Sequence, residues 1–112
     1  MDLNTGNLFQ ALPIDLSEEV FQTLISAGQL KVERIVSNGH RSAADFWYDQ
    51  PQNEWVVLLK GAAIVQIEGM PDQHLEPGCY LDLPAHTRHR VAWTTPETET
   101  VWLAVHYSGT AD

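Results

Sequence analysis

The chain has 112 residues, which provide one hydrophobic core and leave no room for a second domain of ordinary size. Hydrophobic residues make up 44% and charged residues 19%, a composition typical of globular proteins and too apolar for a disordered chain. The formal net charge of -9 would repel phosphate backbones and anionic lipid surfaces, so we expect neither nucleic acid nor a membrane as a partner.

Cysteine content and the start of the chain bear on the compartment. The single cysteine, Cys79, excludes an intramolecular disulfide and with it a disulfide-stapled secreted scaffold. Residues 1–20 carry acids and polar groups where a signal peptide needs a basic start and an apolar run, and no stretch approaches ~18 apolar residues. We therefore expect a cytoplasmic protein without a membrane span.

The first part of the chain, residues 1–29, is predicted to form an arm followed by a short helix. Residues 1–16 have no regular pattern, and their apolar side chains could pack on a barrel or on another subunit. Ser17 has the properties of a helix N-cap, because two glutamates follow it where the helix dipole favours negative charge. The next apolar residues recur at helical spacing and Gly28 is a natural stop, which predicts a short amphipathic helix between them.

Beyond Gly28 the pattern changes to alternating, β-rich segments separated by Gly, Pro, Asn and Asp. Their short, regular spacing is typical of an all-β barrel or sandwich, and it predicts a single barrel domain over residues 30–112. A closed barrel of jelly-roll type is favoured because closure removes most exposed strand edges. Strands are predicted at about residues 30–37, 43–49, 54–60, 62–68, 73–76, 79–83, 88–94 and 100–107.

Two short motifs occur in the middle of the chain. Glu54 is followed by six residues and then Gly61, while Gly78 is followed by five residues, then Pro84, and later His89. These spacings resemble the two halves of the signature of the cupin family. The resemblance covers most of the chain and implies a cupin-type jelly-roll β-barrel, a family in which a divalent metal is often held inside the barrel.

The front of the first motif departs from the family's pattern. Counting back from Glu54, the two alternating histidines of the family would fall on Tyr48 and Gln50, or on Trp47 and Asp49, and none of these residues is a histidine. Two of the four usual metal ligands are therefore replaced or lost. The resemblance constrains the fold more than the chemistry, because one fold hosts many functions.

Strand alternation predicts which side chains share the barrel interior. With this alternation Glu54 faces inward, and so do His89 and Trp93 on a later strand. We therefore expect Glu54 and His89 to lie in one cavity. The other face of the strand at 54–60 is apolar throughout, which suggests that it is covered by a second sheet or by a second copy of the chain in a homodimer.

A carboxylate and an imidazole in an apolar barrel suit a divalent metal such as zinc, iron, manganese or nickel, with open positions for a substrate. Two ligands are too few. His86 is the favoured third ligand, since it lies three residues before His89 at the start of a strand. Further candidates are Asp49, Gln50, Tyr48 and His106. In the alternative without a metal, Glu54 would be an acid satisfied at the barrel mouth and His89 a core histidine.

Three functions compete at this point. The first is a small metal-dependent cupin enzyme with isomerase-, cyclase- or dioxygenase-type chemistry, in which Glu54 and His89 hold the metal and Tyr48 or His106 acts as general acid or base. The second is a metal-free barrel that binds a small-molecule ligand without catalysis. The third is a structural homodimer.

The pocket lining gives a further indication of the ligand. Gln50 would supply a polar group, and Trp47 and Trp93 would supply apolar surface. Such a mixture is usual in small-molecule sites, and it would fit an aromatic or carbonyl-containing molecule.

Overall fold

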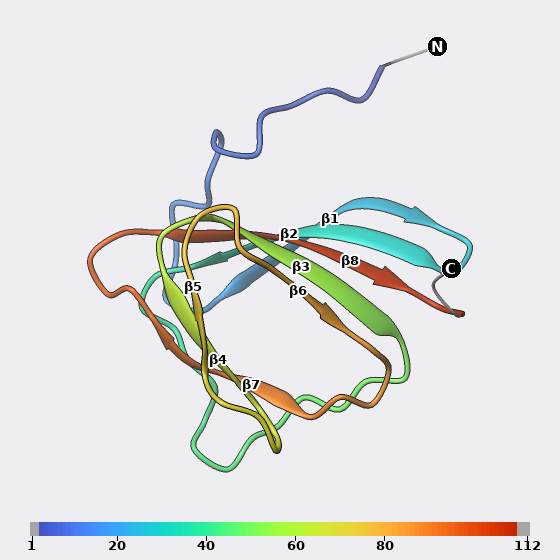
Figure 1. Cartoon of the computed structure of the whole chain (residues 1–112). Helices are drawn as coiled ribbons and strands as arrows, with labels where there is room; N and C mark the ends of the chain where they lie inside the picture. The colour runs from blue at the N-terminus through green and yellow to red at the C-terminus, as the bar shows by residue number, and fades with distance from the viewer. Residues whose placement is uncertain (1–2, 110–112) are drawn as a thin grey trace.

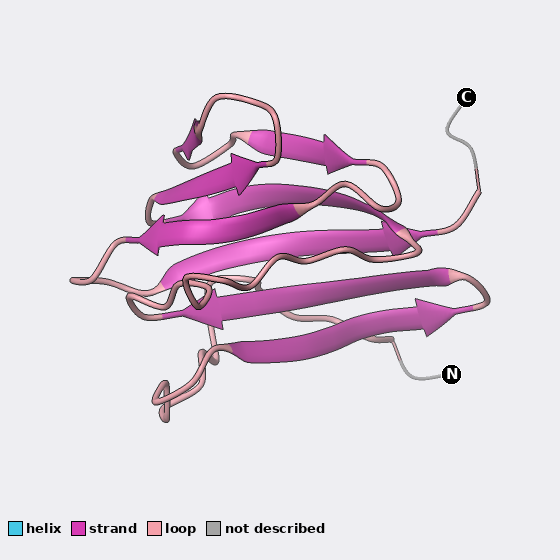
Figure 2. Cartoon of the chain, turned by 90° about the horizontal axis from the view of Figure 1, so that it is seen from below, coloured by secondary structure: helices cyan, strands magenta, loops and turns pink. Residues whose placement is uncertain are grey.

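The structure is a computed structural model that describes residues 3–109. All regular secondary structure in these residues is β, and none of them forms a helix that could cross a lipid bilayer (Figures 1 and 2). The strands form a five-stranded sheet in the order β1-β2-β8-β3-β6 and a three-stranded sheet in the order β5-β4-β7. The expected all-β, jelly-roll-type fold is confirmed. The strands are β1 (Val20–Ala27), β2 (Leu30–Ser37), β3 (Asn53–Lys60), β4 (Ala63–Ile67), β5 (Gln73–Leu75), β6 (Tyr80–Leu83), β7 (His89–Thr94) and β8 (Thr100–Tyr107).

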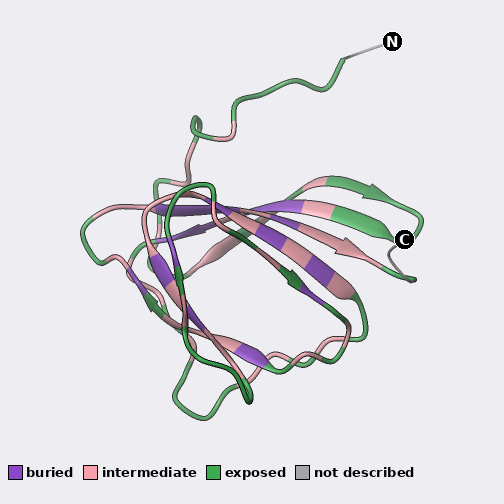
Figure 3. Ribbon diagram, viewed as in Figure 1, coloured by how far each residue is buried: buried purple, intermediate pink, exposed green. Residues whose placement is uncertain are grey.

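The hydrophobic core lies between the two sheets. Strand β3 shows the alternation that builds it, because Val56 and Leu58 are buried while Trp55 and Val57 on the other face are only half-buried (Figure 3). Packing one apolar face of each sheet against the other holds the two layers together. The other buried members of this cluster are Ala63, Val65, Leu75, Leu83, Trp102 and Ala104.

The predicted helix between Ser17 and Gly28 is wrong. Residues 20–27 form β1, which pairs antiparallel with β2 across a turn at Gly28 and Gln29, where Gly28 adopts φ 56°. Ser17 caps no helix, because its backbone N–H donates to Asp15 Oδ1 at 3.0 Å and such a local bond competes with helix formation. The β-branched and aromatic residues of this segment suit a strand, and pairing with β2 outweighs their helical spacing.

The strand predicted at 43–49 is also wrong, whereas the other predicted strands are present with ends that move by no more than one residue. This segment is a loop that runs beside β7, an edge strand of the smaller sheet. The backbone N–H of Tyr48 donates to the His89 carbonyl at 2.7 Å, and the N–H of Ser42 donates to the Val91 carbonyl at 2.8 Å. The loop therefore satisfies backbone groups of β7 that no neighbouring strand covers.

Steric constraints explain why the first motif has glycine at residue 61. Gly61 lies between β3 and β4 with φ 89°, a conformation that residues with a side chain rarely adopt. A Cβ at this position would lie 2.7 Å from Thr100 Oγ1 and 3.1 Å from the Thr100 Cα. Both the backbone conformation and the close approach of β8 therefore require glycine.

The arm before β1 is irregular, as expected, and it is fastened to the sheet by one side chain. Arg34 on β2 is buried, and its guanidinium donates to the backbone carbonyls of Leu8 at 3.2 Å, Gln10 at 2.7 Å and Ala11 at 3.0 Å. Arg34 follows Glu33 on the strand, so the two side chains point to opposite faces of the sheet. The arm accordingly lies on the side of the sheet away from the face that carries Glu33.

Candidate active site

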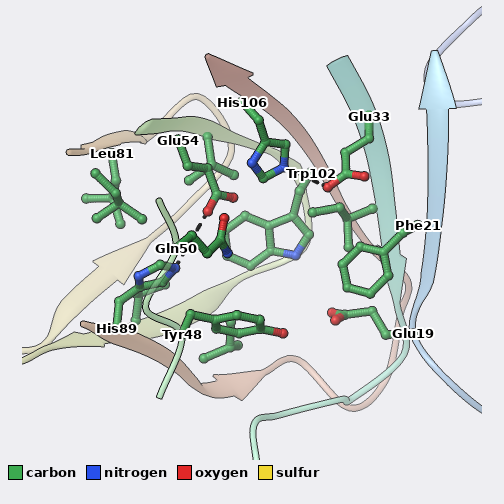
Figure 4. A pocket seen from close by; sticks show the side chains of 15 residues that line it. Glu19, Phe21, Glu33, Tyr48, Gln50, Glu54, Leu81, His89, Trp102 and His106 are labelled. Atoms are coloured by element: carbon green, nitrogen blue, oxygen red, sulfur yellow. Dashed lines mark hydrogen bonds and ion pairs between the residues drawn. The ribbon is translucent and has the colours of Figure 1, made fainter. Parts of the chain in front are cut away.

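A cavity of about 90 Å³ lies inside the barrel (Figure 4). This volume exceeds several times the ~15 Å³ needed for one water molecule, so the cavity has room for a small ligand. A wider depression of about 620 Å³ continues from it and shares Phe21, Glu33, Gln50 and His106 with it. The polar residues of the inner cavity are Glu19, Glu33, Tyr48, Gln50, Glu54, His89 and His106, and its apolar residues are Phe21, Ile35, Val56, Val65, Leu81, Leu83, Val91 and Trp102.

Strand register places three of the polar residues on adjacent strands of the larger sheet. Glu54 on β3 is the direct cross-strand partner of His106 on β8. Ala104, two residues earlier on β8, is the partner of Glu33 on β2. Because side chains two residues apart on a strand share a face, Glu33, Glu54 and His106 all project into the cavity.

His89 reaches the same cavity from the smaller sheet, which confirms that it lies close to Glu54. Its Nε2 lies 3.6 Å from Glu54 Oε1, and both side chains are nearly buried, with 10% and 12% of their surface exposed. The other ring nitrogen, Nδ1, lies 2.9 Å from the Thr87 carbonyl oxygen. A carbonyl can only accept, so Nδ1 carries a proton and donates it, and Nε2 is the nitrogen that faces Glu54.

The charge state of His89 depends on these neighbours. Burial alone lowers the pKa of His89, but the Glu54 carboxylate beside Nε2 and the Thr87 carbonyl at Nδ1 outweigh burial, so that the pKa is raised. The imidazolium form is therefore favoured more than in an exposed histidine. His89 and Glu54 form an ion pair that can hold one proton between them.

A second histidine and carboxylate pair lies next to the first. The Nε2–H of His106 donates to Glu33 Oε1 at 2.8 Å, with 14% and 8% of the two side chains exposed. Lys31 Nζ lies 3.6 Å from the other oxygen of Glu33 and is about half exposed. Within residues 3–109, Glu33 is therefore held by two partners, whereas Glu54 has one, the ion pair with His89.

The remaining polar groups of the cavity lie on its other side. Burial raises the pKa of Glu19, even though the Ser37 hydroxyl donates to this carboxylate at 2.9 Å. Burial also raises the pKa of Tyr48, and the negative charges of Glu19, Glu54 and Glu33 raise it further. The Tyr48 hydroxyl consequently stays protonated and serves as a hydrogen-bond donor.

The other predicted metal ligands, His86 and Asp49, lie on the rim and contact each other. His86 Nδ1 lies 2.8 Å from Asp49 Oδ1, and 68% and 48% of these side chains are exposed. His86 also has φ 62°, a left-handed conformation that residues with a side chain rarely adopt. Among residues 3–109, no three His, Cys, Asp or Glu side chains are grouped closely enough to hold a metal ion.

The predicted pocket tryptophans lie outside the cavity lining, while the predicted Gln50, Tyr48 and His106 are part of it. Trp47 instead lies near Arg88, whose guanidinium carbon is 5.5 Å from the centre of its ring. Trp93 is 38% exposed, because a bulge in the pairing of β4 with β7 reverses its direction relative to His89.

Several residues of the cavity, including Glu19 and Glu33, were not predicted from the sequence. Glu33 belongs to a strand that was predicted correctly, and its alternation with Ile35 was the available signal. Glu19 was assigned to the first turn of the predicted helix. Because that helix is wrong, the position of Glu19 beside the cavity could not be predicted from the sequence.

Comparisons with known proteins agree with this architecture. A family model described as a cupin domain matches residues 35–106. A proposed mannose-6-phosphate isomerase from Ralstonia eutropha JMP134 is 48% identical, with a TM-score of 0.91, and the match covers 94% of this chain and 98% of that one. No curated protein matches the sequence.

More distant structures share the fold alone. A conserved protein of unknown function from Streptococcus pyogenes is 18% identical, with a TM-score of 0.75 and coverage of 99% of this chain and 92% of that one. The DMSP lyase DddQ from Ruegeria pomeroyi DSS-3 is 19% identical with a TM-score of 0.69, and the match covers 96% of this chain and 57% of that one.

Proposed function

Because the chain belongs to the cupin family, we propose that its barrel binds a small organic molecule and that Glu54 and His89 move a proton on that molecule, which is isomerase-type chemistry. The observation that carries this proposal is the buried ion pair, in which Nε2 of His89 lies 3.6 Å from Glu54 at the wall of the cavity. A carboxylate and an imidazole next to each other supply a base and an acid to one substrate.

The hydrogen bonds around the pair assign a role to each group. The Thr87 carbonyl holds the proton on Nδ1 of His89, so Nε2 is the atom that gives and takes a proton. Within residues 3–109 Glu54 has no polar protein partner closer than His89 Nε2 at 3.6 Å, so its carboxylate can also accept a hydrogen bond from a ligand. Glu54 would take a proton from a carbon next to a carbonyl, while Nε2–H of His89 would protonate the carbonyl oxygen. In an α-hydroxy carbonyl compound, Glu54 would then deliver its proton to the former carbonyl carbon while Nε2 of His89 takes the proton of the neighbouring hydroxyl, which forms the isomeric carbonyl without an oxidant or a reductant.

Two shifted pKa values support this assignment. The raised pKa of His89 keeps more of the imidazole in its acid form near neutral pH. The raised pKa of Tyr48 keeps its hydroxyl as a donor for a ligand oxygen, rather than a base. The 48% identical protein from Ralstonia eutropha carries a proposed isomerase assignment, and this also supports isomerase-type chemistry for the present chain.

A metal-dependent version of the reaction has too few ligands. Of the four predicted ligands only Glu54 and His89 lie together in the cavity, because His86 and Asp49 pair with each other on the rim. Protein sites for divalent metals use three or more side chains, so this donor set does not fit and the proposal uses no metal. Elemental analysis of untagged protein checks this. Near-stoichiometric zinc, iron, manganese or nickel that disappears in Glu54→Ala and His89→Ala would overturn the metal-free assignment.

The experiment that tests the proposed function is proton exchange in D₂O, followed by NMR. Mannose 6-phosphate, glyceraldehyde and glucosamine present an anionic, a neutral and a cationic carbonyl compound. We expect deuterium to enter at C2 of at least one of them, and Glu54→Gln and His89→Gln to slow this exchange by about 100-fold. Glu76→Gln, at an exposed residue outside the cavity, is the matched control and should not change the rate.

One outcome would favour the alternative of a binding protein without catalysis. If the folded wild-type protein exchanged no proton on any of the three compounds, acid–base catalysis by Glu54 and His89 would have no support. The cavity would then be a ligand site only, and the two side chains would be hydrogen-bond partners for the ligand.

A further inference from the structure

The lining of the inner cavity contains more carboxylates than basic groups. Its side chains include three carboxylates, from Glu19, Glu33 and Glu54, and neither a lysine nor an arginine. The only groups that can compensate them within the lining are His89 and His106. While Glu19 is ionised, the three carboxylates outnumber the two imidazoles even when both imidazoles are protonated, and burial, which raises the pKa of Glu19, favours its neutral form at lower pH. A low-dielectric wall strengthens the attraction of this cavity for positive charge and its repulsion of anions.

Aromatic rings surround the same space. Figure 4 shows the ring of Phe21 between the carboxylates of Glu19 and Glu33, the indole of Trp102 beside it, and Tyr48 with its hydroxyl directed toward Glu19. Faces of aromatic rings attract cations through the negative charge of the π-system, and tryptophan does so most strongly. Rings with carboxylates beside them form a lining that suits an alkylated or primary ammonium group.

Glu54 provides an independent indication that a ligand group is needed. Glu54 is 9% exposed, and within residues 3–109 its carboxylate has only the 3.6 Å ion pair with His89 and no hydrogen bond. A nearly buried carboxylate with so few protein partners depends on the remaining water or on a ligand for its other hydrogen bonds. A cationic ligand in the cavity would supply the missing partner.

From these three observations we infer that the inner cavity selects a small organic cation, with its ammonium group against the rings of Tyr48 and Trp102 and within reach of Glu19 and Glu54. The inference rests on the proposed function only for the assignment of this cavity as the ligand site. A sugar phosphate would bring negative charge toward the carboxylates of the inner cavity. Lys31 lines the outer depression rather than the inner cavity, is about half exposed, and already contacts Glu33. The expected substrate class therefore differs from a phosphate ester.

Binding of an unreactive cation tests the inference separately from catalysis. Tetramethylammonium has the size of tert-butanol but carries a charge, and pivalate provides an anion with a similar alkyl group. Titration of ¹⁵N-labelled protein with each compound reports on the indole N–H of Trp102, whose signal is assigned with Trp102→Phe. We expect tetramethylammonium to bind at least about tenfold more tightly than tert-butanol, and pivalate to leave the Trp102 signal unchanged.

Variants distinguish the cavity from the acidic surface of the whole protein. Glu19→Gln and Glu54→Gln each remove one charge from the lining and should weaken tetramethylammonium binding several-fold. Glu76→Gln removes the same charge from an exposed position and should not weaken it. The dispersion of the same spectra shows whether each variant is folded, and either variant alone suffices if the other is not.

Several results would overturn the inference. They are equal affinity for tetramethylammonium and tert-butanol, a shift of the Trp102 signal by pivalate alone, the absence of binding by tetramethylammonium, and an equal loss of affinity in Glu76→Gln. None of these depends on proton exchange, because tetramethylammonium has no carbonyl. Failure of the cation to bind therefore leaves the proposed proton transfer to be judged by its own experiment.

Discussion

The rings of Tyr48 and His89 stack on each other, with centroids 5.3 Å apart and an angle of 23° between their planes. Their backbones form an antiparallel bridge at the same point. Tyr48 lies on the loop that covers β7, so this loop fixes the orientation of the imidazole on one side while Glu54 lies on the other. The geometry of the proposed acid–base pair therefore depends on a segment that is not part of either sheet.

The stability of the protein should fall as the pH rises through the range in which His89 loses its proton. The pKa of His89 is raised in the folded state, so folding favours the charged form. Its contribution is complete below the unfolded pKa of about 6.5 and is lost as the pH rises through the higher folded pKa. We expect the urea midpoint to decrease between about pH 6 and pH 8, and Glu54→Gln to flatten this dependence. His74→Gln, at an exposed histidine, is the control. A steeper profile in Glu54→Gln would contradict the assignment.

Removal of His106 should destabilise the protein more than removal of both members of its pair. His106→Ala leaves the Glu33 carboxylate buried with only Lys31, and breaking a buried pair in this way costs about 3 kcal/mol. The double variant Glu33→Gln with His106→Ala should recover much of this loss, because no unpaired charge remains. Urea unfolding of the single and double variants gives the interaction free energy. Strictly additive losses would show that the pair is not coupled.

Gly61→Ala should lower stability by more than Gly69→Ala. Both glycines have positive φ, at 89° and 80°, so both variants incur a backbone strain of about 1–3 kcal/mol. Only Gly61 also has Thr100 in the way, whereas a Cβ at Gly69 meets nothing within 4 Å. The difference between the two unfolding free energies, measured by urea denaturation, isolates the steric conflict. Equal losses would mean that β8 moves away at no cost.

His86→Gly should be tolerated, unlike His89→Gly. Glycine adopts φ 62° without strain, and the lost contact with Asp49 is largely exposed, so we expect stability to stay within about 1 kcal/mol. Proton exchange should also remain, since His86 lies on the rim. Loss of activity in folded His86→Gly would place this histidine in the reaction. His89→Gly, by contrast, should abolish exchange.

Secondary structure was predicted correctly where the local sequence pattern fits only one kind of element. Strands such as 54–60 and 100–107 alternate regularly, and the structure reproduces them. The segment 20–27 has apolar residues at spacings that fit both a helix and a strand, and only its pairing with β2 decides between them. The segment 43–49 is apolar and aromatic, yet its backbone serves as a cover for the edge of β7, which no local pattern indicates.

Some residues of the candidate site could likewise be predicted from the sequence, and others could not. Glu54 and His89 were expected to share a cavity because a motif places both on inward faces, and the structure brings them together. Trp93 was expected inside as well, but a bulge shifts the alternation of β7 by one residue before it. Glu33 became part of the site through the register between β2 and β8, which depends on chain segments far apart in the sequence.

The bond between Glu33 and His106 joins positions that are 73 residues apart in the chain. Contacts of such long range form slowly, because the entropy of closing a long loop is lost before the contact is gained. The cavity wall accordingly requires β2 from the first half of the chain and β8 from its end. A nascent chain that has not yet released β8 from the ribosome lacks one wall of the site, so ligand binding begins only when synthesis of the barrel is complete.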